Sequence, residues 1–487
     1  MRHILLVVAF VLLCSFFAYV YLGLSLPIQL IHITVPYLIK NGLVLYRDIV
    51  YHHTPLMQFI LTGFYTTFGY TFFAYRLYFL LTVLLTLFFV YKSGSYLSQK
   101  SGFFAVLFFT IFYLPFFSDS QLEEVTVAFF SSISLYLFVR YIKTNKDKYI
   151  FLSGASIGAA IMTKQVVAVL APVIFIYLFV KKIREERWAL NIEIWWFSLG
   201  LSSVIGIISL YFFLQNAFID FFYWNILFNL TTYAKDAPVA SASEGLKVAF
   251  IFTSFVFPLL FIYKKKYLSS FEREAVIVLV LFAFGLLFGL LPSFYINRLR
   301  GLFVISSVGY GFLFAKLISM SSKFSDKNFG LFSKTSFIIL IVFTLVSIPY
   351  VQNLFEYIQS FPGKPYNIVD YNKDDLKAVV WLKKNTVKDE KIMNLGNHYI
   401  LFLSQRLPAN KYLWPIPWLL KPYDKSAREI EMDPPKFVID SKLNHVDYPQ
   451  VPSLNDWPFY EFLDENYMMA AKFGDVRIYK IKKLIKI

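Results

Sequence analysis

Long apolar runs constrain this chain more than any other feature of its sequence. Stretches of about 18 or more apolar residues recur along most of the chain, each long enough to cross roughly 30 Å of hydrocarbon as a helix. Hydrophobic residues make up 57% of the 487 residues and charged residues only 16%. That leaves too little polar surface for a water-soluble protein of this length. The runs are continuous rather than alternating, which excludes a β-barrel. The sequence therefore predicts a polytopic α-helical membrane protein.

The net charge of +16 reports membrane orientation rather than a nucleic-acid partner. Lysines and arginines gather in short loops between apolar runs, and the positive-inside rule places such loops in the cytoplasm. These basic clusters are Lys92 and Lys100; Arg140, Lys143, Lys146 and Lys148; Lys181, Lys182, Arg184 and Arg187; Lys264, Lys265, Lys266 and Arg273; and Lys316, Lys323, Lys327 and Lys334.

With these loops inside, the chain has eleven predicted transmembrane helices, an N-terminus in the cytoplasm and a C-terminus outside. The predicted spans are 4–24, 72–92, 102–117, 125–142, 150–163, 165–180, 192–214, 246–263, 273–291, 299–317 and 331–350. We interpret the first as a retained anchor, because Ser25-Leu26-Pro27 is a poor signal-peptide cleavage site. It contains Cys14, the single cysteine, so no disulfide can form within the chain.

The segment 54–69 is apolar, but counting it as a span would place basic loops outside. We therefore expect it to be a helix on the outer surface, opened by Thr54 at the N-cap and Pro55 at the first helical position. The predicted transmembrane domain, 1–350, thus has a long first outer loop, 25–71. Residues 351–487 are richer in charges and turns, which predicts a small α/β domain on the outer side. Its expected elements are a helix at 374–384 and strands at 391–394, 436–439 and 476–479.

Asp48 lies in a polar island of the first outer loop, between Arg47 and the pair His52-His53. Ionisable groups near a bilayer mark substrate sites more often than they are incidental. A purely structural pair of Asp48 with Arg47 is about equally consistent with the sequence. A single histidine, His53, is a better hydrogen-bonding candidate than a metal ligand, because adjacent histidines cannot share one face of a helix or strand.

A second acidic group, Asp119, Glu123 and Glu124, stands where the chain enters the next predicted span. Acids at a helix N-terminus are favoured by the helix dipole by about 0.3–1 kcal/mol, so a solvated helix start explains Glu123 and Glu124 without a function. The functional alternative is a second acid facing Asp48 that holds a sugar, an amine or a cation.

Three cations are expected at the outer ends of spans. Lys164, at the break between two short spans, can extend to the headgroups or bind a phosphate at the membrane surface. Arg298 and Arg300 have guanidinium groups that match phosphate geometry, although outer-leaflet headgroups satisfy them equally well.

These motifs resemble the C-type glycosyltransferases, and in particular the family-39 enzymes: the protein O-mannosyltransferases and the bacterial aminoarabinose transferase of lipid A. The resemblance covers nearly the whole chain. It rests on Ile39 to Asp48, His53 to Leu56, Phe68-Gly69, Ala74 to Leu77, Glu123-Glu124, Gly158 to Gln165, and the C-terminal stretch from Val380 to Tyr467.

The resemblance implies an enzyme that takes a sugar from a polyprenyl-phosphate carrier and passes it, with inversion, to a lipid, glycan or protein acceptor outside the cytoplasmic (inner) membrane. Asp48 matches the family's catalytic aspartate, and Glu123 or Glu124 matches its second acid. The expected contacts of the carrier phosphate are Lys164, Arg298, Arg300, Tyr295 and Arg76. A divalent cation is possible, and no nucleotide-binding motif is present or needed.

The main alternative is a flippase or transporter of lipid-linked sugars. Alternating access is usually accompanied by paired repeats with broken helices in matching positions, and the sequence contains no such pairing. A polysaccharide polymerase or ligase would place its key residues in a long late loop, whereas here the polar residues gather in the first one.

Overall fold

The computed structural model describes twelve segments of the chain. They are residues 12–23, 29–113, 122–184, 192–233, 253–264, 268–289, 300–321, 373–388, 390–395, 397–413, 434–441 and 458–482. Packing divides the chain into two compact units. Unit 1 comprises Met1–Pro27, Arg76–Leu210 and Val239–Tyr366, and unit 2 comprises Ile28–Tyr75, Tyr211–Pro238 and Asn367–Ile487. The first outer loop therefore packs with C-terminal residues in one unit, and the predicted domain boundary at residue 350 stays a prediction.

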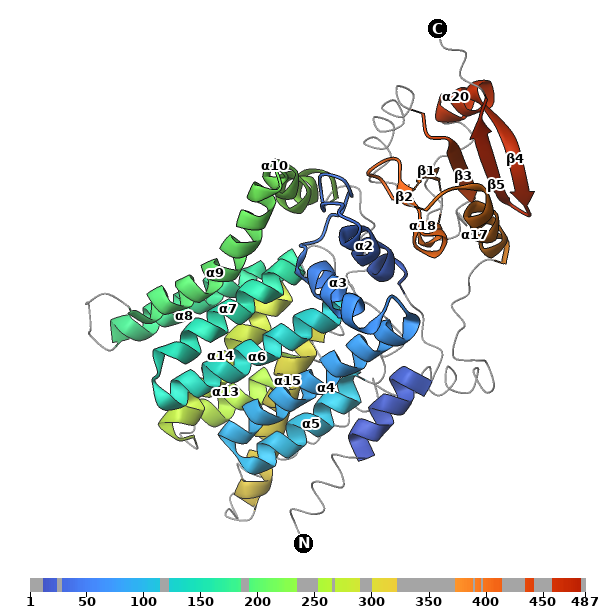
Figure 1. Ribbon diagram of the computed structural model, residues 1–487. Coiled ribbons are helices and arrows are strands. Elements are labelled where there is room, and N and C mark those ends of the chain that lie inside the picture. Colours follow the sequence, from blue (N-terminus) through green and yellow to red (C-terminus); the bar gives the residue numbers. More distant parts are fainter. Residues whose placement is uncertain are drawn as a thin grey trace. The chain divides into compact units, whose positions relative to one another are not determined.

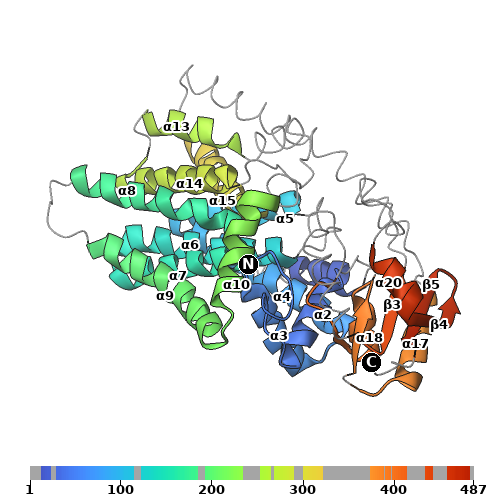
Figure 2. The same cartoon turned by 90° about the horizontal axis from the view of Figure 1, so that it is seen from above.

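Unit 1 is a bundle of helices that run alongside one another (Figures 1 and 2). Its helices are α4 (Phe72–Leu97), α5 (Gln99–Tyr113), α6 (Leu122–Thr144), α7 (Asp147–Thr163), α8 (Leu170–Arg184), α9 (Ile192–Leu214), α13 (Val256–Lys264), α14 (Ser270–Phe288) and α15 (Arg300–Ser321). A short 3₁₀ helix, η3 (Gln165–Val169), joins α7 to α8, as the predicted break at Lys164 requires.

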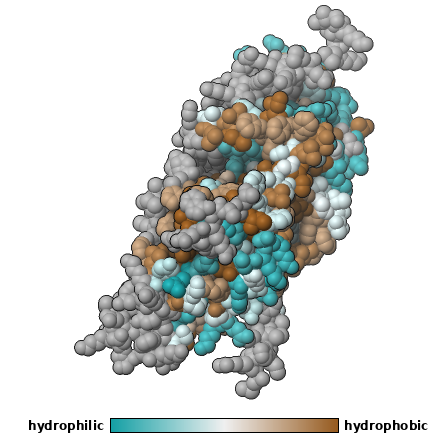
Figure 3. All heavy atoms as spheres, turned by 90° about the vertical axis from the view of Figure 1, so that its left-hand side faces the viewer, coloured by the Kyte–Doolittle hydropathy of each residue, from teal (hydrophilic) through white to brown (hydrophobic). Residues whose placement is uncertain are grey.

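The helices confirm a multi-pass membrane protein. Five described helices are long and apolar enough to cross a bilayer, within Phe72–Leu97, Leu122–Thr144, Gln165–Ile183, Ile192–Leu214 and Arg300–Ser319. Many apolar side chains on them are exposed, among them Trp195, Ile207 and Phe213. Hydrophobic residues cover broad areas of the face drawn in Figure 3, as expected of a surface in contact with lipid. The count of eleven spans stays a prediction, since 331–350 lie outside the described residues.

Glycines bring α7 and α9 into backbone contact. A Cβ atom on Gly154 would lie 2.3 Å from the carbonyl oxygen of Phe197, and one on Gly200 would lie 2.0 Å from that of Phe151. One turn further along α7, a Cβ on Gly158 would lie 2.8 Å from the oxygen of Leu201. Small residues four apart are the usual means of close helix packing in membranes.

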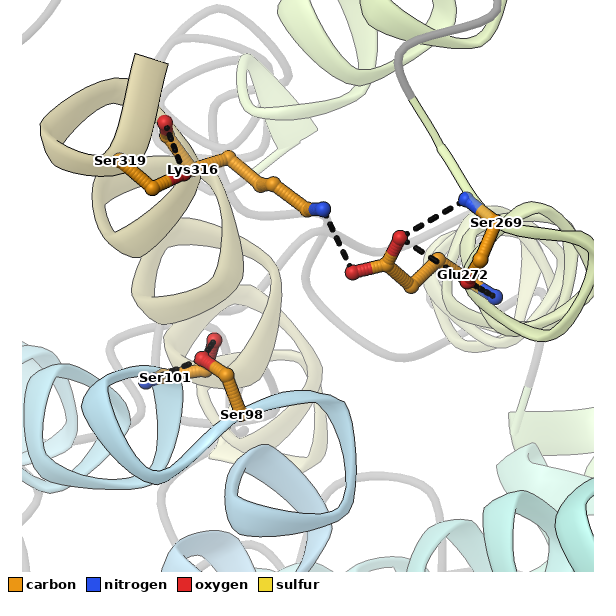
Figure 4. A network of polar contacts seen from close by, with 6 residues as sticks. All are labelled: Ser98, Ser101, Ser269, Glu272, Lys316 and Ser319. Atoms are coloured by element: carbon orange, nitrogen blue, oxygen red, sulfur yellow. Dashed lines mark hydrogen bonds and ion pairs between the residues drawn. The ribbon is translucent and has the colours of Figure 1, made fainter. Parts of the chain in front are cut away.

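Two described lysines of the basic clusters, Lys181 and Lys316, lie at the end of the bundle where α14 begins. Glu272 lies in the first turn of α14 and forms a capping box with Ser269, in which the two residues exchange hydrogen bonds. Its carboxylate also forms an ion pair with Lys316 of α15, at 2.6 Å (Figure 4). Lys181 of α8 pairs with Glu274 at 3.0 Å, next to the same helix start. Because α15 begins at Arg300, its Lys316 lies about 24 Å away along the helix axis. Lys316 and Arg300 therefore lie at opposite ends of α15.

In unit 2, the first outer loop forms two helices, α2 (Ile31–Lys40) and α3 (Leu56–Phe68). Residues His32 to Leu38 of α2 are all buried, and α3 and a C-terminal helix both pack on α2. The predicted helix at 54–69 is confirmed, although Pro55 rather than Thr54 occupies its N-cap. Its 13 residues span only about 20 Å, less than the thickness of a hydrocarbon core.

The C-terminal part of unit 2 is a five-stranded sheet with three helices, which confirms the predicted small α/β fold. The helices are α17 (Lys373–Asn385), α18 (Tyr399–Ser404) and α20 (Pro458–Asn466). The strands are β1 (Lys391–Asn394), β2 (Leu407–Pro408), β3 (Phe437–Ser441), β4 (Tyr467–Phe473) and β5 (Val476–Ile481), in the order β2-β1-β3-β5-β4 (Figure 1). β1 is parallel to β2 and β3, and the other pairs are antiparallel.

Arg406 links the C-terminal ends of α17 and α18 by hydrogen bonds. Its buried guanidinium donates to the carbonyl oxygen of Thr386, just after α17, at 2.7 Å and to that of Ser404, the last residue of α18, also at 2.7 Å. A cation suits the carbonyl groups that helix C-termini leave unpaired.

Candidate active site

Asp48 lies in a tight turn of the first outer loop. The Val44 amide donates to Asp48 Oδ2 at 2.8 Å, and the Asp48 amide donates back to the Val44 carbonyl at 2.9 Å. The Arg47 guanidinium forms a bidentate ion pair with the Asp48 carboxylate: Nε lies 2.9 Å from Oδ1, and Nη2 lies 2.8 Å from Oδ2. The Asp48 side chain is still 32% exposed. Oδ1 has no other hydrogen-bond partner among the described residues, so it can accept one from a substrate hydroxyl.

The surroundings keep Asp48 ionised. Partial burial opposes the charged form, but hydrogen bonds from Arg47 and from the Val44 amide, together with the charges of Arg47 and Lys391, outweigh it and lower the pKa of the Asp48 carboxyl. The structural reading that pairs Asp48 with Arg47 is thus met in part, because the ion pair exists. Such an exposed pair contributes only about 0.2–1 kcal/mol to stability.

Tyr46 anchors this turn in an unusual conformation. Its φ of 71° lies in the left-handed region, which costs a non-glycine residue about 1–3 kcal/mol. The ring is buried against Phe212 and Phe221, with centroids 5.0 and 5.5 Å away. Burial raises the pKa of its hydroxyl, which stays protonated and donates to the His53 carbonyl at 2.8 Å. His53 is therefore held through its backbone, beside the ring of His52 at 4.1 Å.

A series of hydrogen bonds between buried polar side chains links the Asp48 loop to α2 and α3. Gln58 of α3 donates to the Tyr51 hydroxyl at 2.8 Å and lies 3.3 Å from His32 Nδ1. His32 Nε2 lies 2.8 Å from Gln29 Oε1. These distances fit a ring that donates from Nε2 to Gln29 and accepts at Nδ1 from Gln58.

Glu124, a candidate for the second acid, has a partner that the sequence analysis did not predict. Lys164 Nζ donates to Glu124 Oε1, and both side chains are buried in unit 1, at 7% and 1% exposure. Glu124 lies in the first turn of α6, and Lys164 follows the last residue of α7. Glu124 Oε2 has no hydrogen-bond partner within the described part of the chain. The interpretation of Lys164 as a side chain extended toward headgroups is wrong, because the ammonium turns inward to an acid in a low-dielectric interior.

Other predicted site residues lie at the same end of the bundle. Arg300, the first residue of α15, is fully buried, with its guanidinium carbon 5.5 Å from the Tyr113 ring centroid and 5.9 Å from that of Phe79. Arg76 and Glu123, near the starts of α4 and α6, are also buried. Solvated headgroups or a solvated helix start therefore explain neither Arg300 nor the two glutamates.

Three predicted residues, Asp119, Tyr295 and Arg298, lie outside the described residues. The described residues contain no group of three or more histidine, cysteine, aspartate or glutamate side chains placed to hold a metal ion.

Sequence reasoning missed three features of these sites. Nothing in the sequence marked the φ of Tyr46, the role of Gln58 or the proximity of Lys391 to Asp48. The Glu124–Lys164 pair did leave a signal: two opposite charges at neighbouring helix ends of an apolar bundle are expected to pair.

Known proteins match both the sequence and the fold. Residues 52–212 match the family described as dolichyl-phosphate-mannose-protein mannosyltransferase. The crystal structure of ArnT from Cupriavidus metallidurans bound to undecaprenyl phosphate is similar along 97% of both chains, with a TM-score of 0.55 and 13% identity. Its apo structure matches along 98% of both chains, with a TM-score of 0.51 and 13% identity. The chain has the fold of a C-type glycosyltransferase. No curated protein sequence matches it.

The resemblance seen in the sequence is confirmed, and together these matches indicate a glycosyltransferase of the C type. The family match contains Arg76, Glu123, Glu124 and Lys164, and it begins after Asp48. The family match therefore does not bear on Asp48.

Proposed function

We propose that this C-type glycosyltransferase moves a sugar from a polyprenyl-phosphate carrier to an acceptor on the outer side of the membrane, with Asp48 as the general base. The observation that carries the proposal is the Asp48 carboxylate. It is charged, one-third exposed and fixed by Arg47 and the Val44 amide, with one oxygen able to accept a further hydrogen bond. A base for an acceptor hydroxyl needs these properties together.

In the proposed reaction, Oδ1 of Asp48 accepts a hydrogen bond from the acceptor hydroxyl and takes its proton as the hydroxyl oxygen attacks the anomeric carbon. The bond between that carbon and the phosphate oxygen breaks, and the carrier leaves as polyprenyl phosphate. A phosphate is a good leaving group and needs no general acid. A single in-line displacement inverts the anomeric centre. A positioned base contributes about 10²- to 10⁴-fold to the rate of such a step.

The donor class draws support from the match to ArnT bound to undecaprenyl phosphate. In our proposal the buried cations of unit 1, Lys164, Arg300 and Arg76, hold the carrier phosphate together with Arg298 and Tyr295. Fixed cations in a water-poor site stabilise the charge that develops on a departing phosphate. Glu124, Glu123 and Asp119 then face the sugar, and the unpaired Glu124 Oε2 is an acceptor for one of its hydroxyl groups.

The proposed orientation follows from the charges. The bundle end that carries Lys181 and Lys316 faces the cytoplasm by the positive-inside rule. The end with Glu124, Lys164 and Arg300 then faces outward in the cytoplasmic membrane, where a carrier chain in the bilayer presents its phosphate.

The test is Asp48→Asn, compared with the exposed control Asp464→Asn in α20. Both variants are reconstituted with undecaprenyl-phosphate-linked hexose and pentose donors and a membrane extract as acceptor, and release of undecaprenyl phosphate is measured. We expect a loss of about 10²- to 10⁴-fold for Asp48→Asn and none for the control. Near-normal release by Asp48→Asn would return Asp48 to a structural role. Movement of intact donor across the membrane without release of the carrier would instead identify a flippase.

A further inference from the structure

A backbone hydrogen bond joins the C-terminal α/β part of unit 2 to the loop that carries Asp48. The amide of Val50, two residues after Asp48, donates to the carbonyl oxygen of Lys411 at 2.8 Å. Val50 is buried, as are Tyr412 and Leu413 after the acceptor. A buried amide without this partner would cost about 1–3 kcal/mol, so the loop conformation depends on the C-terminal segment.

Side chains extend this contact on both sides of the loop. Phe402 of α18 meets Tyr37 of α2, with ring centroids 5.7 Å apart. Tyr412 meets Trp224 of the short helix η4 (Tyr223–Leu227), at 6.4 Å. From the segment that follows η4, Asn229 donates to the His52 carbonyl at 2.9 Å. The loop is thus held between residues 211–229, the helices of the first loop and the C-terminal part.

The C-terminal part also brings a charge to Asp48. Lys391 is the first residue of β1, which lies between β2 and β3 in the sheet. Burial, Arg47 and the Val44 amide act on Asp48 more strongly, and the charge of Lys391 adds to the effect that lowers the pKa of this carboxyl. Of the other titratable groups nearby, Tyr211 interacts with both Arg47 and Asp48, and Asp220 interacts with Arg47. A phenol does not titrate in the acidic range, so Arg47 and Lys391 are the cations that matter there.

We propose that the α/β part, from α17 to β5, is a component of the active site: it fixes the Asp48 loop through Lys411 and Phe402, and it contributes the cation of Lys391 at the edge of its sheet. Lys391 and Phe402 are positioning residues in this scheme. The inference rests on the proposed role of Asp48 as the base. It assigns a function to a part of the chain that could otherwise be regarded as an appendage.

The charge is tested by Lys391→Met, with Lys391→Arg as the conservative variant and Lys377→Met as the matched control. Lys377 lies on α17 of the same part and pairs with Asp374 instead. Removing this cation should move the acidic limb of the kcat profile to higher pH, with KM for the donor unchanged. Lys391→Arg should keep the original limb. If the acidic limbs of the kcat profiles of Lys391→Met and Lys377→Met coincide, the proposed effect of Lys391 on Asp48 is overturned.

The positioning is tested by Phe402→Ala against Phe462→Ala. Phe462 lies on α20, where its ring contacts Tyr467 of the same α/β part. Loosening α18 from α2 should speed amide hydrogen exchange in residues 44–54 by about ten-fold or more, and kcat should fall while binding of undecaprenyl phosphate persists. Phe462→Ala should leave exchange in 44–54 unchanged. Equal protection of 44–54 in both variants, with equal turnover, overturns this role.

The two proposals fail separately. If Asp48→Asn keeps its activity, the proposed base is wrong whatever Lys391 does. If Asp48→Asn is inactive while Lys391→Met and Phe402→Ala match their controls, only the role of the α/β part is refuted.

Discussion

Lys164 and Glu124 form an ion pair inside the helical bundle, between the end of α7 and the start of α6. Two charges buried at a membrane depth gain little net stability from each other, and breaking such a pair by removing one partner is costly. The pair therefore holds the Lys164 ammonium at a fixed place, and in our proposal the ammonium exchanges part of this contact for the carrier phosphate.

The first prediction separates binding from stability at this pair. Lys164→Met leaves Glu124 uncompensated and should destabilise the protein by about 3–5 kcal/mol, measured by thermal unfolding in detergent. The double variant Glu124→Gln with Lys164→Met should recover most of that loss. Both should bind undecaprenyl phosphate about ten-fold or more weakly, because a charge-assisted hydrogen bond contributes roughly 1.5–3 kcal/mol. Normal binding by the double variant would show that the carrier phosphate is held elsewhere.

The second prediction concerns pH. Asp48 has a lowered pKa, so its active, ionised form should persist below the ordinary aspartate range near pH 4, and activity should fall as pH drops through the lowered value. Arg47→Met removes two hydrogen bonds to the carboxylate and should move this acidic limb to higher pH. The ionised carboxylate also adds stability above pH about 4, which is lost as pH falls through the folded pKa. Exposure limits that contribution to under about 1 kcal/mol. If the acidic limb of the pH–activity profile of Arg47→Met stays where it is in the wild type, a group other than Asp48 controls that limb.

The third prediction concerns the strained turn. Tyr46→Phe keeps the buried ring but loses the hydrogen bond to the His53 carbonyl, so stability should drop by about 0.5–1.5 kcal/mol and kcat by a few-fold. Tyr46→Ala also loses the ring packing and should cost about 3–5 kcal/mol. Chemical unfolding and turnover measure both effects. Equal turnover in the wild type and both variants would show that Asp48 does not need this anchor.

The fourth prediction fixes the membrane orientation. In a Cys14→Ser background, a cysteine at Thr67, exposed near the end of α3, should react with an impermeant thiol reagent added outside intact cells. A cysteine at Lys146, exposed between α6 and α7, should react only after permeabilisation. The reverse pattern would invert the topology and move the proposed site to the cytoplasmic side.

Much of the fold could be predicted because its signals are local. An apolar run long enough to cross a bilayer has few alternatives to a helix, so α4 and α9 match their predicted spans closely. The break after Thr163 was visible in the short runs on either side of Lys164. The helix α2 was missed because it contains Pro36 and has Leu30, without a capping side chain, at its N-cap.

The candidate site was predictable residue by residue but not as a set of contacts. Asp48 and Arg47 are adjacent in sequence, so their pairing could be expected. Glu124 and Lys164 are forty residues apart, and Val50 and Lys411 are joined through backbone atoms that carry no side-chain signal. Such contacts depend on how separate segments pack, and no short motif encodes them.

The glycine contact between α7 and α9 limits the path by which a lipid can enter. Backbone atoms of the two helices touch around Gly154, Gly158 and Gly200, so neither an acyl nor an isoprenoid chain fits between them at that depth. Lys164 lies about 9 Å further along the chain from Gly158. A polyprenyl tail whose phosphate reached Lys164 would therefore have to thread in from another flank of the bundle. The α7–α9 contact thus excludes one route by which the carrier lipid could enter the bundle.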